Sequence, residues 1–310
     1  MDGVGSAAAP LRLGTRRSAL ALAQSGMVAR TVSEVTGRPV ELIEISTYGD
    51  VSKEHLAQIG GTGVFVSALR DALTAGVIDL AVHSLKDLPT AAPDGLLLVA
   101  VPEREDARDV LVARDGLKFA DLPPGARVGT GSPRRAAQLR LQREDLEIVA
   151  VRGNVDTRIG FVTAGSLDAV VLAYAGMSRL GRIGEATDHF DPAAMVPAPG
   201  QGALAIECRA GDAELARQLE QLEHRPTRVA VRAERALLAA LEAGCSAPVG
   251  GYATVADEVL HLTGIVADVA SPRSIRMSTT GPLDQAEQLG RDLAARLLAQ
   301  GAAGFMGKQT

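Results

Sequence analysis

The chain has 310 residues, a formal net charge of −5, 46% hydrophobic residues and 22% charged residues. Aromatic residues make up only 3%, with no tryptophan, which argues against recognition of single-stranded nucleic acid by base stacking. The negative charge gives no overall attraction to nucleic acid or an anionic membrane. Two cysteines are too few for a disulfide framework. No apolar stretch approaches the length of about 18 residues that indicates a membrane-spanning helix. We therefore expect a cytoplasmic protein of two or three domains.

The first third of the chain predicts alternating strands and helices. The stretch "RLGTRRSALALAQ" (12–24) predicts a strand, a glycine-bearing turn and a helix. Further short strands are predicted in "VELIEISTYGD" (40–50) and "VIDLAVHSLKDL" (77–88). Short apolar runs bounded by turn residues suit strands that are covered on both faces, as in parallel α/β sheets with right-handed crossovers.

The second third repeats this order. "RVGTGSPRRAAQL" (127–139), "DLEIVAVRGNV" (145–155) and "SLDAVVLAYAGM" (166–177) correspond to the three stretches above. Any two α/β segments share some of these features, but the common order favours an internal duplication. The sequence therefore predicts two similar α/β lobes that face each other across a cleft.

The remainder, from about residue 221, has a different pattern. "TRVAVRAERALLAALEAG" has apolar residues at helical spacing and predicts a helix that ends at Gly244. "GYATVADEVLHLTGIVA" alternates, turns at Asp257 and Glu258, and alternates again, which predicts antiparallel strands. "DQAEQLGRDLAARLLAQG" predicts a closing amphipathic helix. These elements form a small α+β domain.

Arginine, serine and threonine residues gather where predicted strands end. In "RVGTGSPRR" a strand ends at Gly129, Ser132 is placed to cap a helix, and Pro133 fits its first position. Helix N-termini attract anions, and the arginine fork pairs with carboxylates or phosphates. Some of these arginines could instead pair with acidic side chains. Taken together they predict a polyanion site, formed by Arg16, Arg17, Ser18, Thr130, Ser132, Arg134, Arg135, Arg152 and Arg158. The glycine spacing matches neither a P-loop nor a dinucleotide-binding turn.

"AVHSLKDLP" places His83, Lys86 and Asp87 just after a buried strand. A carboxylate there could stabilise a cation, accept a proton or bind a ring N–H. Lys86 could bind a carboxylate or act as a Schiff-base nucleophile. A solvated Lys86–Asp87 pair and a hydrogen-bonded core histidine are equally consistent with the spacing. The histidines are scattered, so we expect no metal site.

Cys245 lies in "LEAGCSAPVG", a turn-forming stretch between the first predicted helix and the first predicted strand of the small α+β domain. From its surroundings alone, this thiol could be a packing residue, a nucleophile, a metal ligand or an attachment point. No histidine is close to it in sequence.

Nine stretches occur in this order along the chain: "GTRRSALALAQ", "GGTGVFVSAL", "DLAVHSLKDLP", "EREDARDV", "VGTGSPRRAAQL", "RGNVDTR", "LAYAGMSRLG", "APGQGALAIECR" and "GCSAPVGGYA". Together they resemble the hydroxymethylbilane synthase, or porphobilinogen deaminase, family. The resemblance covers roughly residues 11–300, and the shared order argues against chance.

The resemblance implies an α/β fold with two periplasmic-binding-protein-like lobes around a cleft and a small α+β C-terminal domain. The first lobe would comprise residues 11–102 with 200–220, the second lobe 103–199, and the C-terminal domain 221–310. The C-terminal domain would carry the cofactor cysteine.

The resemblance also implies a transferase of tetrapyrrole and heme biosynthesis. Such enzymes condense four porphobilinogen molecules head to tail with loss of ammonia, and then release hydroxymethylbilane by hydrolysis. They build the product on a dipyrromethane cofactor bound through a thioether, which would be attached here to Cys245. A monomer without nucleic-acid, membrane or metal partners is implied.

The resemblance assigns roles to individual residues. Asp87 and Lys86 match the catalytic positions; Asp87 would bind pyrrole N–H groups, stabilise the cation that forms as ammonia leaves and assist proton transfer. Both would also contact the cofactor. The other cofactor-binding positions are matched by Thr130, Ser132, Arg134, Arg135 and Arg152. Substrate-binding positions are matched by Arg16, Ser18, Arg152, Arg158, Arg179 and Gln201.

Two departures from the family pattern concern anion binding. Gln58 and Thr62 stand where many relatives have lysines, which puts anion contacts from that segment in doubt. Gly131 stands where relatives often have a serine, which removes one hydroxyl donor but keeps the backbone donors.

Two other functions share parts of this pattern. A two-lobed anion-binding or effector-sensing module would have the same lobes without catalysis, but it would need neither a third domain nor Cys245. A hydrolase with a cysteine nucleophile is weakened by the lack of a histidine near Cys245 in the sequence.

Overall fold

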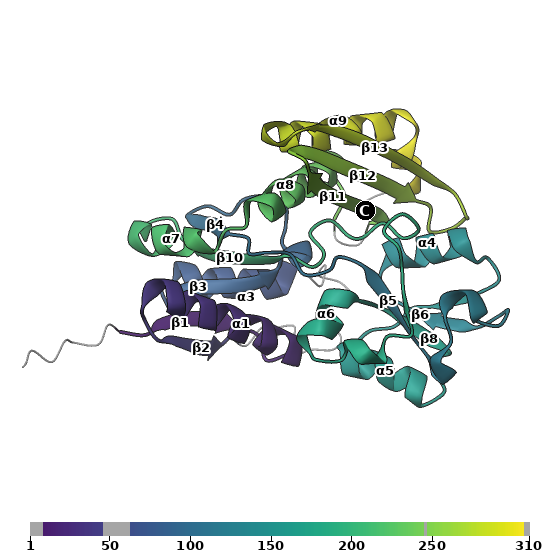
Figure 1. Cartoon of the computed structure of the whole chain (residues 1–310), viewed down its shortest axis with the longest axis horizontal. Helices are drawn as coiled ribbons and strands as arrows, with labels where there is room; N and C mark the ends of the chain where they lie inside the picture. Colours follow the sequence, from purple (N-terminus) through teal and green to yellow (C-terminus); the bar gives the residue numbers. More distant parts are fainter. Residues whose placement is uncertain (1–8, 46–62, 245–246, 307–310) are drawn as a thin grey trace, which may run out of the picture. The chain divides into compact units, whose positions relative to one another are not determined.

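The computed structural model describes residues 9–45, 63–244 and 247–306, and these contain three β-sheets (Figure 1). They fall into two compact units. One unit lies within residues 1–103 and 204–224; the other lies within 104–203 and 225–310. We call the first unit the first lobe. Within the second unit, we call residues 104–203 the second lobe and residues 225–306 the C-terminal domain.

The first lobe contains a five-stranded sheet in the order β2-β1-β3-β10-β4. Strands β1, β2 and β3 are parallel, and β10 is antiparallel to both of its neighbours. Apolar side chains of α1 and α7 pack against one face, and those of α3 pack against the other. The strands are β1 (Leu11–Thr15), β2 (Val40–Glu44), β3 (Leu80–Ser84), β4 (Leu96–Ala100) and β10 (Leu204–Arg209). The helices are α1 (Ala19–Thr36), α3 (Gly63–Thr74) and α7 (Ala213–Leu219).

The second lobe contains a five-stranded sheet in the order β7-β6-β8-β5-β9. Leu139 of α4 packs into the core on one face of the sheet, while α5 and α6 contribute to the core on the other. The strands are β5 (Asp109–Ala113), β6 (Arg127–Gly129), β7 (Glu147–Val149), β8 (Ala169–Ala173) and β9 (Asp188–His189). The helices are α4 (Pro133–Gln142), α5 (Val155–Thr163) and α6 (Tyr174–Arg179).

The predicted duplication is confirmed by the matching strand order of the two lobes and by one repeated hydrogen-bond pattern. In the first lobe, the Arg12 N–H donates to the Asp79 carboxylate at 2.9 Å, and the Asp79 N–H donates to the Arg12 carbonyl at 2.8 Å. In the second lobe, Arg127 and Asp168 make the same two hydrogen bonds, at 2.6 and 2.9 Å. The same pair of residue types therefore begins the same pair of strands in both lobes.

The C-terminal domain is a three-stranded antiparallel sheet in the order β11-β12-β13, and its apolar core is shared with α8 and α9. The elements are α8 (Arg225–Ala240), β11 (Val249–Ala256), β12 (Val259–Ala267), β13 (Ser274–Pro282) and α9 (Ala286–Ala299). Asp257 and Glu258 form the predicted turn between β11 and β12, with φ of 49° and 58°. Positive φ at both central residues suits a tight hairpin turn, and acidic residues tolerate this conformation better than most.

The predicted end of the first C-terminal helix is wrong by a few residues. Helix α8 ends at Ala240, and Glu242 takes the left-handed conformation with φ 52°. The N–H of Ala243 then bonds the Leu238 carbonyl, which closes the helix end. Gly244 therefore lies beyond the helix. Among the described residues, no helix is both long enough and apolar enough to cross a membrane.

Candidate functional site

The first lobe presents Arg16 and Ser18 where β1 ends. Ser18 caps α1, because its hydroxyl accepts a hydrogen bond from the Ala21 N–H at 3.2 Å. Arg16 is half-buried and borders a cavity of about 170 Å³. The strand end, the cap and the arginine thus lie together at the start of α1, as predicted.

Asp87 borders the same cavity as Arg16. It belongs to a single 3-10 turn, Leu85–Asp87, which follows β3 directly. Leu85 is fully buried and anchors the turn, while Lys86 and Asp87 are half-buried. The remaining residues that line the cavity are Ala21, Gln24, Val66, Leu69, Val82, His83 and Ser84. The structure therefore brings Asp87, His83 and Arg16 to one cavity of the first lobe.

In the second lobe, the loop after β6 has the predicted arrangement. Ser132 caps α4 by accepting a hydrogen bond from the Arg135 N–H at 3.4 Å, and Pro133 is the first helical residue. The Thr130 hydroxyl accepts from the Ser132 N–H at 3.2 Å. Both polar side chains therefore shape the turn that leads into α4.

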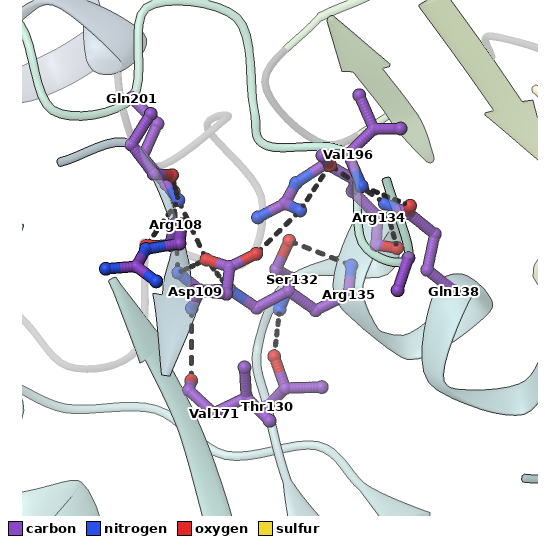
Figure 2. Close-up of polar contacts among 12 residues, drawn as sticks. Arg108, Asp109, Thr130, Ser132, Arg134, Arg135, Gln138, Val171, Val196 and Gln201 are labelled. Atoms are coloured by element: carbon purple, nitrogen blue, oxygen red, sulfur yellow. Dashed lines mark hydrogen bonds and ion pairs between the residues drawn. The ribbon is translucent and has the colours of Figure 1, made fainter. Parts of the chain in front are cut away.

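Arg134 and Arg135 converge on Asp109, the first residue of β5 (Figure 2). Arg135 donates to Asp109 Oδ1 from Nε at 3.0 Å and from Nη2 at 2.8 Å, and its Nη1 donates to the Val171 carbonyl at 3.1 Å. Arg134 Nη1 lies 2.8 Å from Asp109 Oδ2 and donates to the Val196 carbonyl at 2.8 Å. Both guanidinium groups are nearly inaccessible, with side-chain exposures of 3% and 6%.

Asp109 is a residue of this site that the sequence reasoning missed. It lies in "EREDARDV", a stretch that carried the family resemblance without being given a role. Burial alone would raise the pKa of Asp109, but the charges and hydrogen bonds of Arg134 and Arg135 outweigh burial and hold it well below the usual range. An aspartate at the start of an otherwise apolar strand, "DVLVA", was the available signal that a buried cation lies nearby.

Gln201 completes the surroundings of Asp109 (Figure 2). Its side-chain Nε2 donates to Asp109 Oδ1 at 2.8 Å and to the Ala107 carbonyl at 2.7 Å, and the residue is 1% exposed. In this structure Gln201 supports the carboxylate that holds the two arginines.

Arg158 extends this group of arginines from α5. Its Nη2 lies 4.0 Å from the point where a Cβ would stand at Gly131, and its Nε is buried without a hydrogen-bond partner. Burial and, secondarily, the charge of Arg135 lower the pKa of Arg158. A Cβ at Gly131 would lie 2.5 Å from the Val151 carbonyl oxygen, so a serine could not enter here unless the backbone moved. The glycine therefore permits the close approach of the loops that precede α4 and α5.

Arg152 and Arg179 are less closely associated with this group. Arg152 is exposed in the connection between β7 and α5. Arg179, at the end of α6, donates to the Gly202 carbonyl at 2.7 Å, and its Nε is buried without a partner. Burial lowers the pKa of Arg179.

The second lobe thus holds more buried positive charge than the carboxylate of Asp109 can balance. Arg134, Arg135 and Arg158 form the cluster, and Asp109 is the carboxylate that pairs with two of them. Arginine keeps its charge in proteins, and a desolvated cation without a counterion is costly. The unpartnered Nε atoms of Arg134 and Arg158 supply further donors. These guanidinium groups are suited to bind an anion, and a carboxylate can accept hydrogen bonds from their N–H donors.

The strand that follows Cys245 is attached to the second lobe through two connections. The Gly251 N–H donates to the Pro197 carbonyl at 2.9 Å. Glu234 of α8 accepts from the N–H groups of Gly200 at 2.6 Å and Ala253 at 2.8 Å. Gln138 and Arg134 both bond the Val196 carbonyl, so the segment that receives β11 also contacts α4 (Figure 2).

Cys245 itself lies outside the described residues, as do Gln58 and Thr62, so their predicted roles stay predictions. Within the described ranges, no group of three or more His, Cys, Asp or Glu side chains could hold a metal ion. The other cysteine, Cys208, is fully buried in β10, and burial raises the pKa of its thiol to about 11. It is a core residue and a poor nucleophile at neutral pH.

The fold defines a class of two α/β lobes with a further α+β domain. Solved structures align with part of this chain at low TM-scores. The BvgS periplasmic VFT2 domain of Bordetella pertussis aligns with a TM-score of 0.40 and 17% identity, over 68% of this chain and 86% of that chain. The alkanesulfonate-binding protein SsuA of Xanthomonas axonopodis pv. citri aligns with a TM-score of 0.37 and 20% identity, over 75% of each chain.

Family models and curated relatives identify the family. Residues 11–217 match "Porphobilinogen deaminase, dipyromethane cofactor binding domain", and residues 229–299 match "Porphobilinogen deaminase, C-terminal domain". Porphobilinogen deaminase 1 of Streptomyces coelicolor is 61% identical, over 96% of this chain and 98% of the relative. Porphobilinogen deaminase of Thermobifida fusca is 56% identical, over 94% of each. The chain belongs to the porphobilinogen deaminase family.

Proposed function

We propose that this chain is a transferase that makes hydroxymethylbilane. It condenses four porphobilinogen molecules head to tail, with loss of ammonia at each step, and releases the linear product by hydrolysis. Family membership across both matched regions supports this reaction. The structural observation that carries the proposal is the excess of buried arginine in the second lobe, because each porphobilinogen unit brings an acetate and a propionate.

The residues of both lobes fit a carboxylate-bearing cofactor. When bound, dipyrromethane supplies the pyrrole carbon on which the product chain grows. We propose that Cys245 holds it covalently and that its carboxylates are bound by residues named above: Lys86, Thr130, Ser132, Arg134, Arg135 and Arg152. The unpartnered Nε of Arg134 supports this fit. Arg135 already donates from all three of its nitrogens to protein oxygens, so its contribution is mainly its positive charge.

Substrate carboxylates would be bound by a second set of residues: Arg16, Ser18, Arg152, Arg158, Arg179 and Gln201. Arg158 is the strongest of these, because it is desolvated and close to the start of α4. Gln201 acts through Asp109 and Arg135. Ser18 and the N-terminus of α1 can donate hydrogen bonds where Arg16 supplies charge.

Asp87 carries the chemical step in this proposal. Its carboxylate accepts hydrogen bonds from pyrrole N–H groups and stabilises the positive charge that develops on porphobilinogen as ammonia leaves. The position of Asp87 on a small cavity supports this role, because a substrate bound there would lie next to its carboxylate and a preorganised charge can stabilise the developing cation. Lys86, on the same turn, adds a positive charge that can bind a neighbouring carboxylate. We also propose that the protein is cytoplasmic and monomeric.

An intact-mass measurement tests the cofactor assignment. We expect the purified chain to exceed its sequence mass by two porphobilinogen units less two ammonia molecules, and the excess to disappear in Cys245→Ser. The matched control is Cys208→Ser, which removes the buried thiol and should keep the excess mass. An active wild-type protein with the bare sequence mass would contradict the assignment.

A further inference from the structure

A buried cluster of three charged or titratable side chains lies beside the cavity that contains Asp87. Glu207 of β10 has no exposed side-chain surface. Arg70 of α3 donates to its carboxylate from Nε at 3.0 Å and from Nη2 at 2.7 Å. His83 of β3 places its Nε2 3.2 Å from Glu207 Oε2.

The strand register explains why these side chains meet. Glu207 pairs with Ala81, and Ala205 pairs with His83, in the antiparallel contact between β10 and β3. Side chains two residues apart on a strand share a face. Glu207 and His83 therefore both point to the face that α3 covers, where Arg70 lies.

The cluster places the histidine ring against a carboxylate. Burial alone would raise the pKa of Glu207, but its interactions with His83 and Arg70 lower it to about 2, so the carboxylate is ionised at neutral pH. His83 Nε2 lies 3.2 Å from this carboxylate, but the contact lacks the geometry of a hydrogen bond, so the ring nitrogen is buried without a hydrogen-bond partner. Arg70 makes two hydrogen bonds to Glu207, so the carboxylate does not depend on His83 for its counterion.

His83 also borders the cavity that Asp87 and Arg16 line. A histidine ring held against a carboxylate and next to a cavity is an arrangement in which enzymes place an acid–base residue. The ring is 4% exposed, so bulk water does not compete strongly for its protons.

We propose that His83 accepts the proton that each condensation releases; this inference rests on the proposed function. The aminomethyl group of porphobilinogen enters as an ammonium. Its C–N bond breaks, and the electron pair leaves with nitrogen as ammonia. The accepting pyrrole carbon forms the new C–C bond and loses its hydrogen as a proton. The His83 ring takes that proton, Glu207 stabilises the imidazolium, and the proton then passes to the ammonia, which leaves as ammonium. Asp87 meanwhile accepts hydrogen bonds from the pyrrole N–H groups.

The variant His83→Asn tests this assignment, because asparagine can still donate to Glu207 but cannot take up a proton. We expect kcat to fall by about 10²-fold, within the range for loss of a general base. KM and the intact mass should stay at wild-type values, and the limb of the kcat–pH profile that reports the base should disappear. The matched control is His261→Asn, an exposed histidine of β12, which should leave every value unchanged.

Three results separate the outcomes. If His83→Asn keeps the wild-type kcat and pH profile, the assignment of His83 is overturned. It is also overturned if kcat falls only in proportion to the folded fraction, measured by thermal unfolding. If the wild-type protein releases no ammonia from porphobilinogen, the proposed function itself fails.

Discussion

The two lobes share one strand order but bury different charges. In the first lobe, Glu207 is held by Arg70 and His83. In the second lobe, Asp109 is held by Arg134 and Arg135, and Arg158 adds a further positive charge nearby. The first cluster pairs one carboxylate with one arginine and a histidine. The second has more arginine than carboxylate and is suited to attract anions.

The strand registers show that these clusters occupy non-equivalent positions. Asp109 pairs with the last residue of β8, and in the first lobe the residue that pairs with the last residue of β3 is Leu204. By the same registers, the position of Glu207 is taken in the second lobe by Val112. The duplicated scaffold therefore supplies matching strand ends, while each lobe places its own carboxylate at a different point along the sheet.

The largest expected effect comes from Asp87, in the first lobe. Asp87→Ala should reduce turnover by about 10³-fold, because a preorganised charge at the reacting centre is lost. The covalent cofactor mass should be retained more fully than turnover. Asp94→Ala, at an exposed acid of the same lobe, is the control. Undiminished ammonia release by Asp87→Ala would remove Asp87 from the mechanism.

Among these variants, the loss of the Asp109 carboxylate in the second lobe should lower the free energy of unfolding the most. Asp109→Asn leaves Arg134 and Arg135 buried without their carboxylate, and breaking a buried pair in this way costs about 3–5 kcal/mol. Urea unfolding of the variant and of Asp121→Asn, an exposed acid in the same lobe, measures the difference. A free energy of unfolding within 1 kcal/mol of wild type would show that the arginines do not depend on Asp109.

The lowered pKa values of Glu207 and Asp109 predict that the folded protein loses stability in acid. Their pKa values in the folded chain lie below the ordinary range, so their contribution is complete above the unfolded pKa and is lost as pH falls through the folded pKa. For Glu207 this window runs from its ordinary pKa of 4.5 down to about 2, and the contribution is about 3 kcal/mol. Urea unfolding between pH 7 and pH 3 should show a smaller slope with pH in Glu207→Gln than in the wild type. Equal slopes would contradict the folded-state pairing.

The smallest effect is expected for Arg158→Leu. This variant distinguishes a role of Arg158 in substrate binding from a role in folding. Arg158→Leu removes one desolvated cation, so KM for porphobilinogen should rise about tenfold, the loss expected for one charged hydrogen bond. The free energy of unfolding should stay level or increase, because Arg158 forms no ion pair with a carboxylate in the described part of the chain. Arg291→Leu, at an exposed arginine of α9, is the control. A marked loss of stability without a change in KM would assign Arg158 a structural role.

Much of the fold was predictable because its signals are local. The caps at Ser18 and Ser132, the proline that begins α4 and the turn at Asp257 follow from short-range preferences of the residues involved. The duplication was visible because the same residue types begin matching strands. The end of α8 was not predictable from Gly244, since Glu242 took the left-handed conformation first.

The candidate site was predictable only in part. The predicted arginines follow strand ends, which the sequence shows. The partner of Arg135 comes from a strand that lies 26 positions away in the chain, and Arg70, whose partner Glu207 is 137 positions away, was not predicted at all. Pairings of this kind depend on the order of strands in the sheet. The sequence therefore located several of the cations but could not say which were already bound to carboxylates.

We propose that the chain adds porphobilinogen units stepwise and that Asp87 makes each addition possible. Intact mass after brief exposure to limiting porphobilinogen measures these additions one by one. We expect a ladder of masses, each separated by one porphobilinogen less one ammonia, that is absent from Asp87→Ala although this variant keeps the cofactor mass. A wild-type chain whose mass never changes on exposure to porphobilinogen would rule out stepwise addition.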